Sequence, residues 1–236
     1  MKHSIRFALV SIAASLAAAS WAAAAELTPH RAQYKVRISV VSGKLDTELR
    51  ATGDGYVARH IIEAAGLSRM LTRGRMDVTS EFRPEADGIK PVSYRSVDTI
   101  RKDPEQHIRF DWTSNEARGT VGGEEIRVQL EGVAHDAVSI QYELMRDLLN
   151  GGPDDTYVLF DLDKLTVTKV SAAGTKTVRT KAGDYETIGV RHQKEGSSRI
   201  TTLWCAPALD YLPVVIEQHR KGKLNFRATL TSYVPT

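Results

Sequence analysis

Apolar and polar side chains alternate with a period of two along many short windows of this chain, and no other feature constrains its fold as strongly. The apolar Tyr34, Val36 and Ile38, for example, alternate with the basic Lys35 and Arg37. The same alternation runs through residues 45–51, 76–82, 108–112, 126–130 and 224–230. Because successive side chains of a β-strand point to opposite faces of the sheet, each window predicts a strand with one dry face and one wet face.

Short segments that contain Gly or Asp separate these windows, at a spacing of about ten residues. They are residues 41–44, 52–55, 84–88, 121–123, 182–184 and 220–223. Strands that are buried on one face only are typical of antiparallel sheets, since parallel sheets read as continuous apolar runs. A sheet of many strands must curl or close, because its twist accumulates and open edges invite aggregation. We therefore predict an all-β fold, a curled antiparallel sheet that forms a barrel or a β-spiral.

One segment, near residues 136–150, breaks the period of two. Val138, Tyr142, Met145 and Leu149 fall on one helical stripe, and Asp136 is a suitable N-cap. The Asn-Gly-Gly-Pro sequence that follows is typical of a helix end. We predict one α-helix here, which closes one end of the sheet or lines its concave side.

Residues 1–25 have the pattern of a cleavable secretory signal. Lys2 and Arg6 precede an apolar stretch that runs from Phe7 to Ala19, and small residues lead up to Ala25. The apolar run is shorter than the roughly 20 residues that span a bilayer, and no later stretch is long enough. An uncleaved N-terminal anchor is the alternative. We expect cleavage near Ala25, export to the periplasm, and a single mature domain over residues 26–236 without a transmembrane segment.

The charge of the expected mature chain is close to neutral. The full chain has a formal net charge of +3, and removal of Lys2 and Arg6 leaves +1. Lys and Arg are interleaved with Asp and Glu along most of the sequence. Nucleic-acid-binding proteins normally carry a basic excess or a clustered basic face. The sequence therefore predicts that neither nucleic acid nor an anionic membrane surface is the main partner.

Four stretches together resemble a known family. The most specific runs from Thr202-Leu203-Trp204-Cys205-Ala206-Pro207 into residues 210–217, and residues 108–112, 136–144 and 180–187 add to it. They resemble the bacterial envelope family called domain of unknown function 3108, over most of residues 30–234. The resemblance implies an exported, strand-rich protein of barrel or β-spiral type, and it implies no activity. More distantly, the architecture is similar to curved-sheet periplasmic proteins that shelter a lipid chain or bind a peptide.

The sequence contains few features that indicate an enzyme. Its histidines lack the spacing of a metal-binding helix or strand, and no nucleophile elbow or phosphate-binding loop is present. The single cysteine, Cys205, lies in a strand-like run and is expected to be a small buried hydrophobe. We expect no catalytic residues, no metal and no cofactor. A hydrolase of unknown type is the remote alternative.

Binding is the better class of function, because a curled sheet with an apolar concave face forms a natural groove. Trp112 and Trp204 fall on the apolar parity of their strands, and we add Tyr94 and Tyr211 as candidate contacts. Core packing is the simpler interpretation of both tryptophans. The candidate ligands are an acyl chain and an extended segment of an envelope protein. The peptide would use an open sheet edge near Tyr211 and Pro213, because proline cannot donate to a central ladder. The alternative is a purely structural envelope protein without a pocket.

Overall fold

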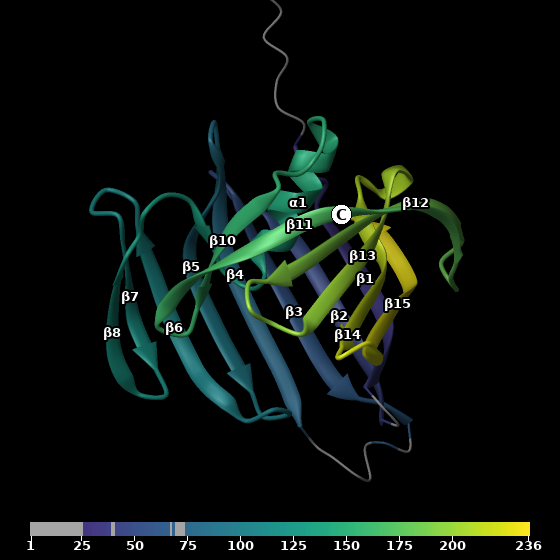
Figure 1. Ribbon diagram of the computed structural model, residues 1–236, viewed down its shortest axis with the longest axis horizontal. Helices are drawn as coiled ribbons and strands as arrows, with labels where there is room; N and C mark the ends of the chain where they lie inside the picture. The colour runs from purple at the N-terminus through teal and green to yellow at the C-terminus, as the bar shows by residue number, and fades with distance from the viewer. Residues whose placement is uncertain (1–25, 39–40, 67, 69–73) are drawn as a thin grey trace, which may run out of the picture.

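The strands of the protein form one continuous antiparallel sheet that curls around a single helix (Figure 1). The computed structural model describes residues 26–38, 41–66, 68 and 74–236. The predicted export signal, residues 1–25, lies outside the described residues. Among the helices that are described, none is long and apolar enough to cross a membrane.

The first half of the chain is a meander of eight strands, each hydrogen-bonded to the next. They are β1 (His30–Ile38), β2 (Val41–Ala51), β3 (Tyr56–Ala64), β4 (Arg75–Glu85), β5 (Gly88–Asp98), β6 (Asp103–Asp111), β7 (Glu116–Val121) and β8 (Glu124–Gln129). The second half contains a two-residue strand, the α-helix and then a second meander. Its elements are β9 (Ala134–His135), α1 (Ser139–Leu149), β10 (Thr156–Asp161), β11 (Lys164–Arg179), β12 (Asp184–Lys194), β13 (Arg199–Ala206), the short 3₁₀ helix η2 (Pro207–Leu209), β14 (Leu212–Arg220) and β15 (Lys223–Pro235).

The two meanders join where the first strand meets the last. Strand β1 pairs antiparallel with β15, so that Val36 lies opposite Ala228, and this gives a single sheet of fifteen described strands. All neighbours in the sheet are antiparallel except β9 and β10. The sheet does not close, because β8 stands at one end of the strand order and β9 at the other. The predicted all-β curled sheet with one helix is confirmed, and its form is that of an open barrel.

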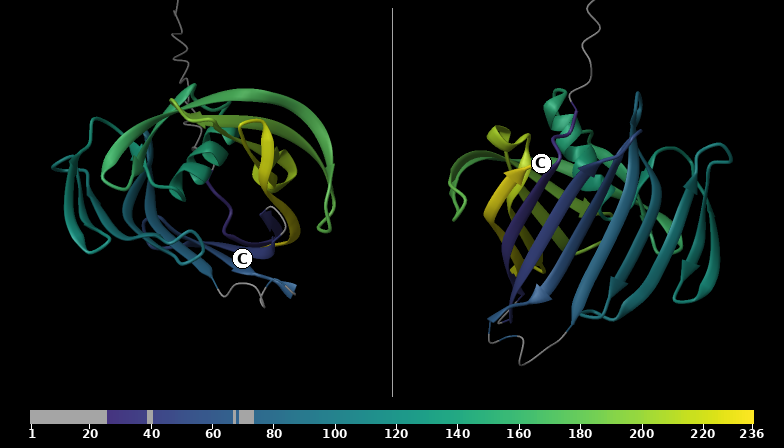
Figure 2. Two further views of the ribbon diagram at one scale, coloured as in Figure 1. Left: turned by 60° about the horizontal axis from the view of Figure 1, so that its bottom comes forward. Right: turned by 180° about the vertical axis from the view of Figure 1, so that it is seen from behind.

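The helix lies on the concave side of the sheet, within the curl (Figure 2). Its buried face includes Tyr142 and Met145, which join one large core with inward-facing strand residues such as Tyr34 and Phe82. Helix α1 spans residues 139–149, inside the predicted 136–150. Its N-cap position is Val138 rather than Asp136, although the Asp136 carboxylate accepts hydrogen bonds from the backbone at the helix start.

Strand β14 is not an edge strand of the sheet, as the sequence had suggested near Tyr211 and Pro213, because it lies between β13 and β15. Pro213 itself pairs only with Cys205 of β13, since the ladder between β14 and β15 begins at Val215. A register shift between Trp204 and Cys205 also lies directly beside it. A proline is tolerated there because the regular ladder is interrupted. The edges of the sheet are β8 and β9 instead.

Candidate functional site

The structure separates the four residues that the sequence suggested as ligand contacts. Tyr94 is buried on the inner face of β5, where burial raises the pKa of its hydroxyl. Trp112 follows β6, and its indole N–H donates a hydrogen bond of 2.6 Å to the carbonyl of Pro91. Tyr211 packs against a smaller core cluster beneath α1. Tyr94 and Trp112 both pack with the main core cluster, whereas Tyr211 packs against the smaller one, so the four residues do not form one site.

Trp204 lies on the outer face of the sheet, away from the helix. Its neighbours in β13, Leu203 and Cys205, belong to the cluster that packs against Leu144 and Leu148 of α1. Burial raises the pKa of the Cys205 thiol to about 12, so very little thiolate is present near neutral pH. The helix-facing side of β13 is therefore a packed core.

Three groups hold the Trp204 ring on the outer face. Its indole N–H donates to the Glu217 carboxylate at 3.1 Å, and the Lys176 ammonium lies 3.6 Å from the ring centroid. The ring also covers Gly189, where an added Cβ would come within 2.7 Å of the indole. These contacts fully account for Trp204 as a structural residue.

The concave side of the sheet is filled by side chains over the described residues. Tyr34, Phe82, Tyr142 and Met145 are each no more than 2% exposed. The rings of Phe82 and Tyr142 stack with centroids 5.3 Å apart, so the helix is in direct contact with the strands. These contacts leave the expected acyl-chain site on the concave face without structural support.

Two buried carboxylates on α1 serve this packing. Glu143 accepts a hydrogen bond of 2.5 Å from the backbone N–H of Ile89, and burial raises the pKa of its carboxyl to about 7. Asp147 accepts a hydrogen bond of 2.5 Å from the Tyr157 hydroxyl, and burial also raises its pKa. Both groups attach the helix to neighbouring strands. Within the described residues, no three His, Cys, Asp or Glu side chains lie close enough to hold a metal ion.

The grooves that are lined by described residues lie on the outer face. One of them has a volume of about 800 Å³ and crosses β4 to β7. Its lining exposes more apolar than polar surface, but most of its residues are polar: Thr79, Ser93, Tyr94, Arg95, His107, Ile108, Arg109, Asp111, Arg118, Gly119 and Thr120. A groove of about 450 Å³ over β7 and β8 shares Arg118, Gly119 and Thr120 with it. A third, of about 220 Å³ over β4 and β5, shares Arg95. We refer to the first of these as the outer groove.

A row of three arginines crosses the outer groove. Arg109 on β6 lies directly opposite Arg118 on β7, which lies directly opposite Arg127 on β8. Directly opposed residues have Cβ atoms only about 5 Å apart, and like charges in such positions destabilise a sheet. Arg118 and Arg127 share the carboxylate of Glu116. Among the described residues, no acidic side chain lies within ion-pair distance of Arg109.

A tight backbone contact lies beside this row. At Gly119 the φ angle is 157°, and an added Cβ would come within 1.8 Å of the carbonyl oxygen of His107. No larger residue fits there without moving the backbone of β6 and β7. Glycine therefore permits the close approach of these two strands, on which Arg109 and Arg118 lie opposite each other.

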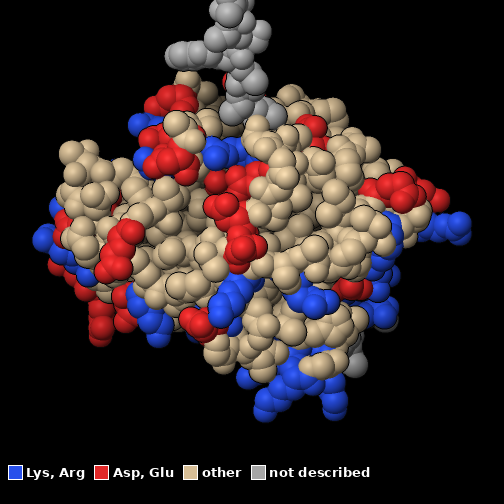
Figure 3. All heavy atoms as spheres, turned by 45° about the horizontal axis from the view of Figure 1, so that its top comes forward, with Lys and Arg blue, Asp and Glu red and all other residues tan. Residues whose placement is uncertain are grey.

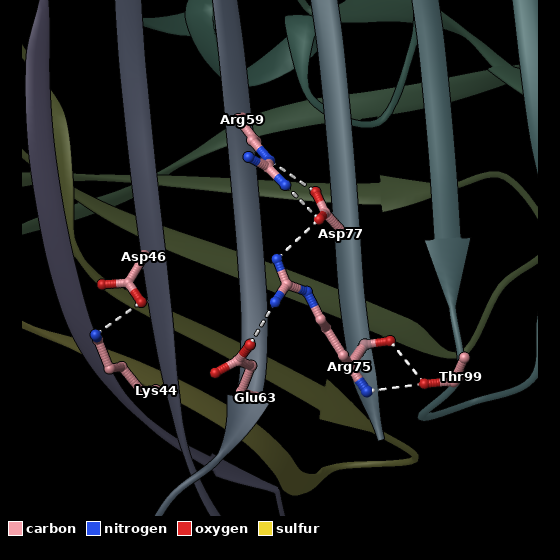
Figure 4. A network of polar contacts seen from close by, with 7 residues as sticks. All are labelled: Lys44, Asp46, Arg59, Glu63, Arg75, Asp77 and Thr99. Atoms are coloured by element: carbon pink, nitrogen blue, oxygen red, sulfur yellow. Dashed lines mark hydrogen bonds and ion pairs between the residues drawn. The ribbon is translucent and has the colours of Figure 1, made fainter. Parts of the chain in front are cut away.

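Two arginines of the neighbouring strands, Arg59 and Arg75, are neutralised by carboxylates (Figure 4). Arg59 donates two hydrogen bonds to the Asp77 carboxylate, at 2.9 and 2.6 Å. Arg75 bridges Glu63 and Asp77, and the two guanidinium groups hold the pKa of the Asp77 carboxyl below its ordinary value. The charged network of β2–β4 is thus internally matched. In the arginine row of β6–β8, among the described residues, only the carboxylate of Glu116 lies within ion-pair distance of the guanidinium groups, and Asp111 lies further away in the same groove.

Sequence reasoning did not find the arginine row. The three arginines stand nine residues apart, on the polar parity of successive strands. The two-residue length of the Gly122-Gly123 turn is the signal that could have placed Arg118 opposite Arg127.

The charge distribution on the end of the molecule that carries α1 is different, because acidic and basic side chains are interspersed there (Figure 3).

Comparisons with known proteins identify a family and a fold. The family described as "protein of unknown function (DUF3108)" matches residues 26–230. A beta-barrel-like protein of domain of unknown function DUF1849 from Brucella abortus has a similar structure, with a TM-score of 0.59 and 13% identity. The alignment covers 90% of this chain and 99% of that one. A protein with a YmcC-like fold from Bacteroides fragilis matches with a TM-score of 0.34 and 12% identity, over 89% of this chain and 96% of that one. No curated protein matches the sequence.

Proposed function

The chain belongs to the DUF3108 family of proteins of unknown function, and for this member we propose a role as an exported, non-enzymatic binding protein of the cell envelope whose outer groove takes a carboxylate-bearing ligand. The observation that carries the proposal is the row formed by Arg109, Arg118 and Arg127. The three guanidinium groups lie opposite one another, and only the Glu116 carboxylate is ion-paired with the row. A bound anion would therefore reduce the repulsion between these guanidinium groups.

Export is supported by the sequence of residues 1–25. A basic start, a short apolar run and small residues before Glu26 are the parts of a cleavable signal. The mature protein would then act in the periplasm.

A binding role, rather than catalysis, is supported by the chemistry of the groove. Arg109 and Arg118 are cationic hydrogen-bond donors only. Ser93 and Thr120 add hydroxyl groups to the same lining. Asp111 also lines the groove, but its carboxylate accepts hydrogen bonds from the backbone of residues 113 and 114. This set can hold an anion in place, and it offers no paired nucleophile and base.

The size and openness of the groove favour a chain-like ligand. The outer groove continues into the smaller grooves on either side through Arg95 and Arg118. A ligand with several carboxylates could therefore contact Arg109 and neighbouring arginines at the same time. Planar guanidinium groups match carboxylates with two parallel hydrogen bonds, which gives orientation as well as affinity.

Isothermal titration of purified residues 26–236 with a short oligo-glutamate tests the proposal, with oligo-glutamine of the same length as the neutral probe. We expect saturable binding of oligo-glutamate only. Inorganic tripolyphosphate serves as a competitor, and displacement by it at equal charge would show that the groove selects phosphate rather than carboxylate.

An Arg109→Gln variant should bind oligo-glutamate at least about ten-fold more weakly, since a hydrogen bond to a charged group contributes about 1.5–3 kcal/mol. Arg31→Gln is the matched control, because Arg31 lies on the outer face of β1 in an exposed ion pair with Glu48. Equal binding by the wild type and the Arg109→Gln variant would contradict the proposal.

A further inference from the structure

Strand β8 leaves one edge of the sheet open. It is the last strand in the sheet order and pairs only with β7. It lies at one extremity of the molecule in Figure 1 and in both views of Figure 2. An unpaired strand exposes a row of backbone N–H and C=O groups that can pair with another strand.

The two faces of this edge differ. Ile126 and Val128 point to the inner face, are half-buried and pack against the main core. Glu125 and Arg127 are exposed on the outer face, and the Arg127 side chain retains 68% of its accessible surface. A strand that pairs here must therefore offer apolar residues on the inner face. On the outer face it must place a charge of opposite sign across from each charge of β8.

The outer face of β8 satisfies this requirement with itself. In an antiparallel pair of two β8 strands centred on Ile126, the two Ile126 side chains lie opposite each other on the inner face, and Val128 of each copy lies opposite Glu124 of the other. Arg127 of each copy then lies opposite Glu125 of the other, so that both outer-face contacts join opposite charges. Such directly opposed pairs of opposite charge stabilise antiparallel sheets.

The neighbouring registers are worse. A shift by one residue would place apolar side chains opposite charged ones and mismatch the two faces. The next register that keeps the faces matched is centred on Arg127, and it would place two guanidinium groups directly opposite each other. The charge pattern of β8 thus selects the pairing centred on Ile126.

We propose that two copies of this chain pair antiparallel through β8, about a two-fold axis at Ile126, and so continue one sheet across a homodimer. The contact is isologous, so each copy contributes the same surface. It uses Glu125, Ile126 and Arg127, whereas the outer groove is lined by Arg109 and Arg118. Arg127 also belongs to the arginine row, so the two proposals share this residue. Arg109→Gln changes no residue of the dimer contact, and it therefore tests ligand binding apart from dimerisation.

Sedimentation-velocity measurements of residues 26–236 over a wide concentration range give the first test. We expect a reversible, concentration-dependent monomer–dimer equilibrium, with weak affinity because only five residues of β8 from each copy form the new ladder. A protein that remains monomeric at all concentrations would overturn the proposal.

Charge reversal gives the sharper test. Glu125→Arg places two basic side chains at positions 125 and 127 on the outer face of the edge, and Arg127→Glu places two acidic ones there. Each variant alone should therefore dimerise at least about ten-fold more weakly than the wild type. The double variant Glu125→Arg/Arg127→Glu restores both pairs and should regain the dimer. An equimolar mixture of the two single variants should form a heterodimer, because a basic edge meets an acidic one.

Arg31→Glu is the matched control, since Arg31 on β1 also has a side chain that is 68% exposed but is not at an edge. It should leave the dimer unchanged. Circular dichroism confirms that each variant is folded. A double variant that dimerises no better than the single variants, together with single variants that do not combine, would overturn the proposed register.

Discussion

The hydroxyl of Ser80 on β4 donates a buried hydrogen bond of 2.6 Å to the Oδ2 atom of Asp136, 56 residues away in the sequence. The Oδ1 atom of the same carboxylate accepts the backbone N–H groups of Val138 and Ser139, at 2.8 and 2.9 Å. One fully buried side chain thus satisfies the start of α1 and fixes it to the first meander. This contact determines where the helix lies within the curled sheet.

Removal of that carboxylate should destabilise the whole fold. Asp136→Ala leaves the buried Ser80 hydroxyl and two helix N–H groups without an acceptor, and we expect a loss of about 2–4 kcal/mol in the free energy of unfolding. Urea denaturation followed by circular dichroism measures it. Asp46→Ala, which removes only a surface ion pair with Lys44, should cost less than about 0.5 kcal/mol. Equal losses in the two variants would refute this role of Asp136.

The contact between Gly189 and Trp204 predicts a steric coupling. Gly189→Ala places a Cβ 2.7 Å from the indole and 2.9 Å from the Cβ of Ala173, so we expect a loss of about 1–3 kcal/mol in unfolding free energy. In a Trp204→Leu background the same substitution should cost less, because the ring is gone. Gly53→Ala is the control, since nothing lies within 4 Å of an added Cβ there. Additive costs at positions 189 and 204 would show that the contact carries no strain.

Buried histidines predict that the protein loses stability in mild acid. Burial lowers the pKa of His60, His135 and His192 to about 4 each, against about 6.5 in an unfolded chain. Between these values the unfolded state binds more protons, so the free energy of unfolding falls as the pH falls from 6.5 towards 4. Each group can contribute at most about 1.4 kcal/mol per pH unit. Glu143 acts in the opposite direction, because its folded pKa is raised to about 7.

A variant isolates the contribution of one histidine. His60→Gln should weaken the pH dependence of unfolding between pH 6.5 and 4.5, by up to the amount assigned to a single group. Urea midpoints at several pH values give the slope. An unchanged slope in His60→Gln would show that His60 does not contribute to the acid sensitivity.

Much of this fold could be predicted from the sequence. The strict alternation in β1, β6 and β15 fixes which side chains face the core, because a strand has only two faces. The helix was predictable because its stripe and its Gly-Gly-Pro ending both break the strand pattern. The open state of the barrel was not, since closure depends on the distance between β8 and β9, the two end strands, rather than on any local pattern.

The errors trace to bulges and to register. Pro213 pairs with β13 but lies before the start of the β14–β15 ladder at Val215, and no local rule distinguishes that position from an edge strand. Parity alone placed Trp204 with the apolar face of its strand, whereas Leu203 and Cys205 take that face in β13. The arginine row was missed because its prediction requires the strand registers of two successive hairpins. Of the two turns, only Gly122-Gly123 has a sequence that indicates the register of its hairpin.

The direct test of the account is an NMR titration that observes the arginine side-chain Nε–H signals of residues 26–236 as oligo-glutamate is added. We expect the signals of Arg109 and Arg118 to shift with one common saturation curve, because both guanidinium groups line the outer groove. The signal of Arg59, which is already bonded to Asp77, should stay in place. Shifts that are uniform over all arginines, or absent from Arg109, would contradict the proposed binding site.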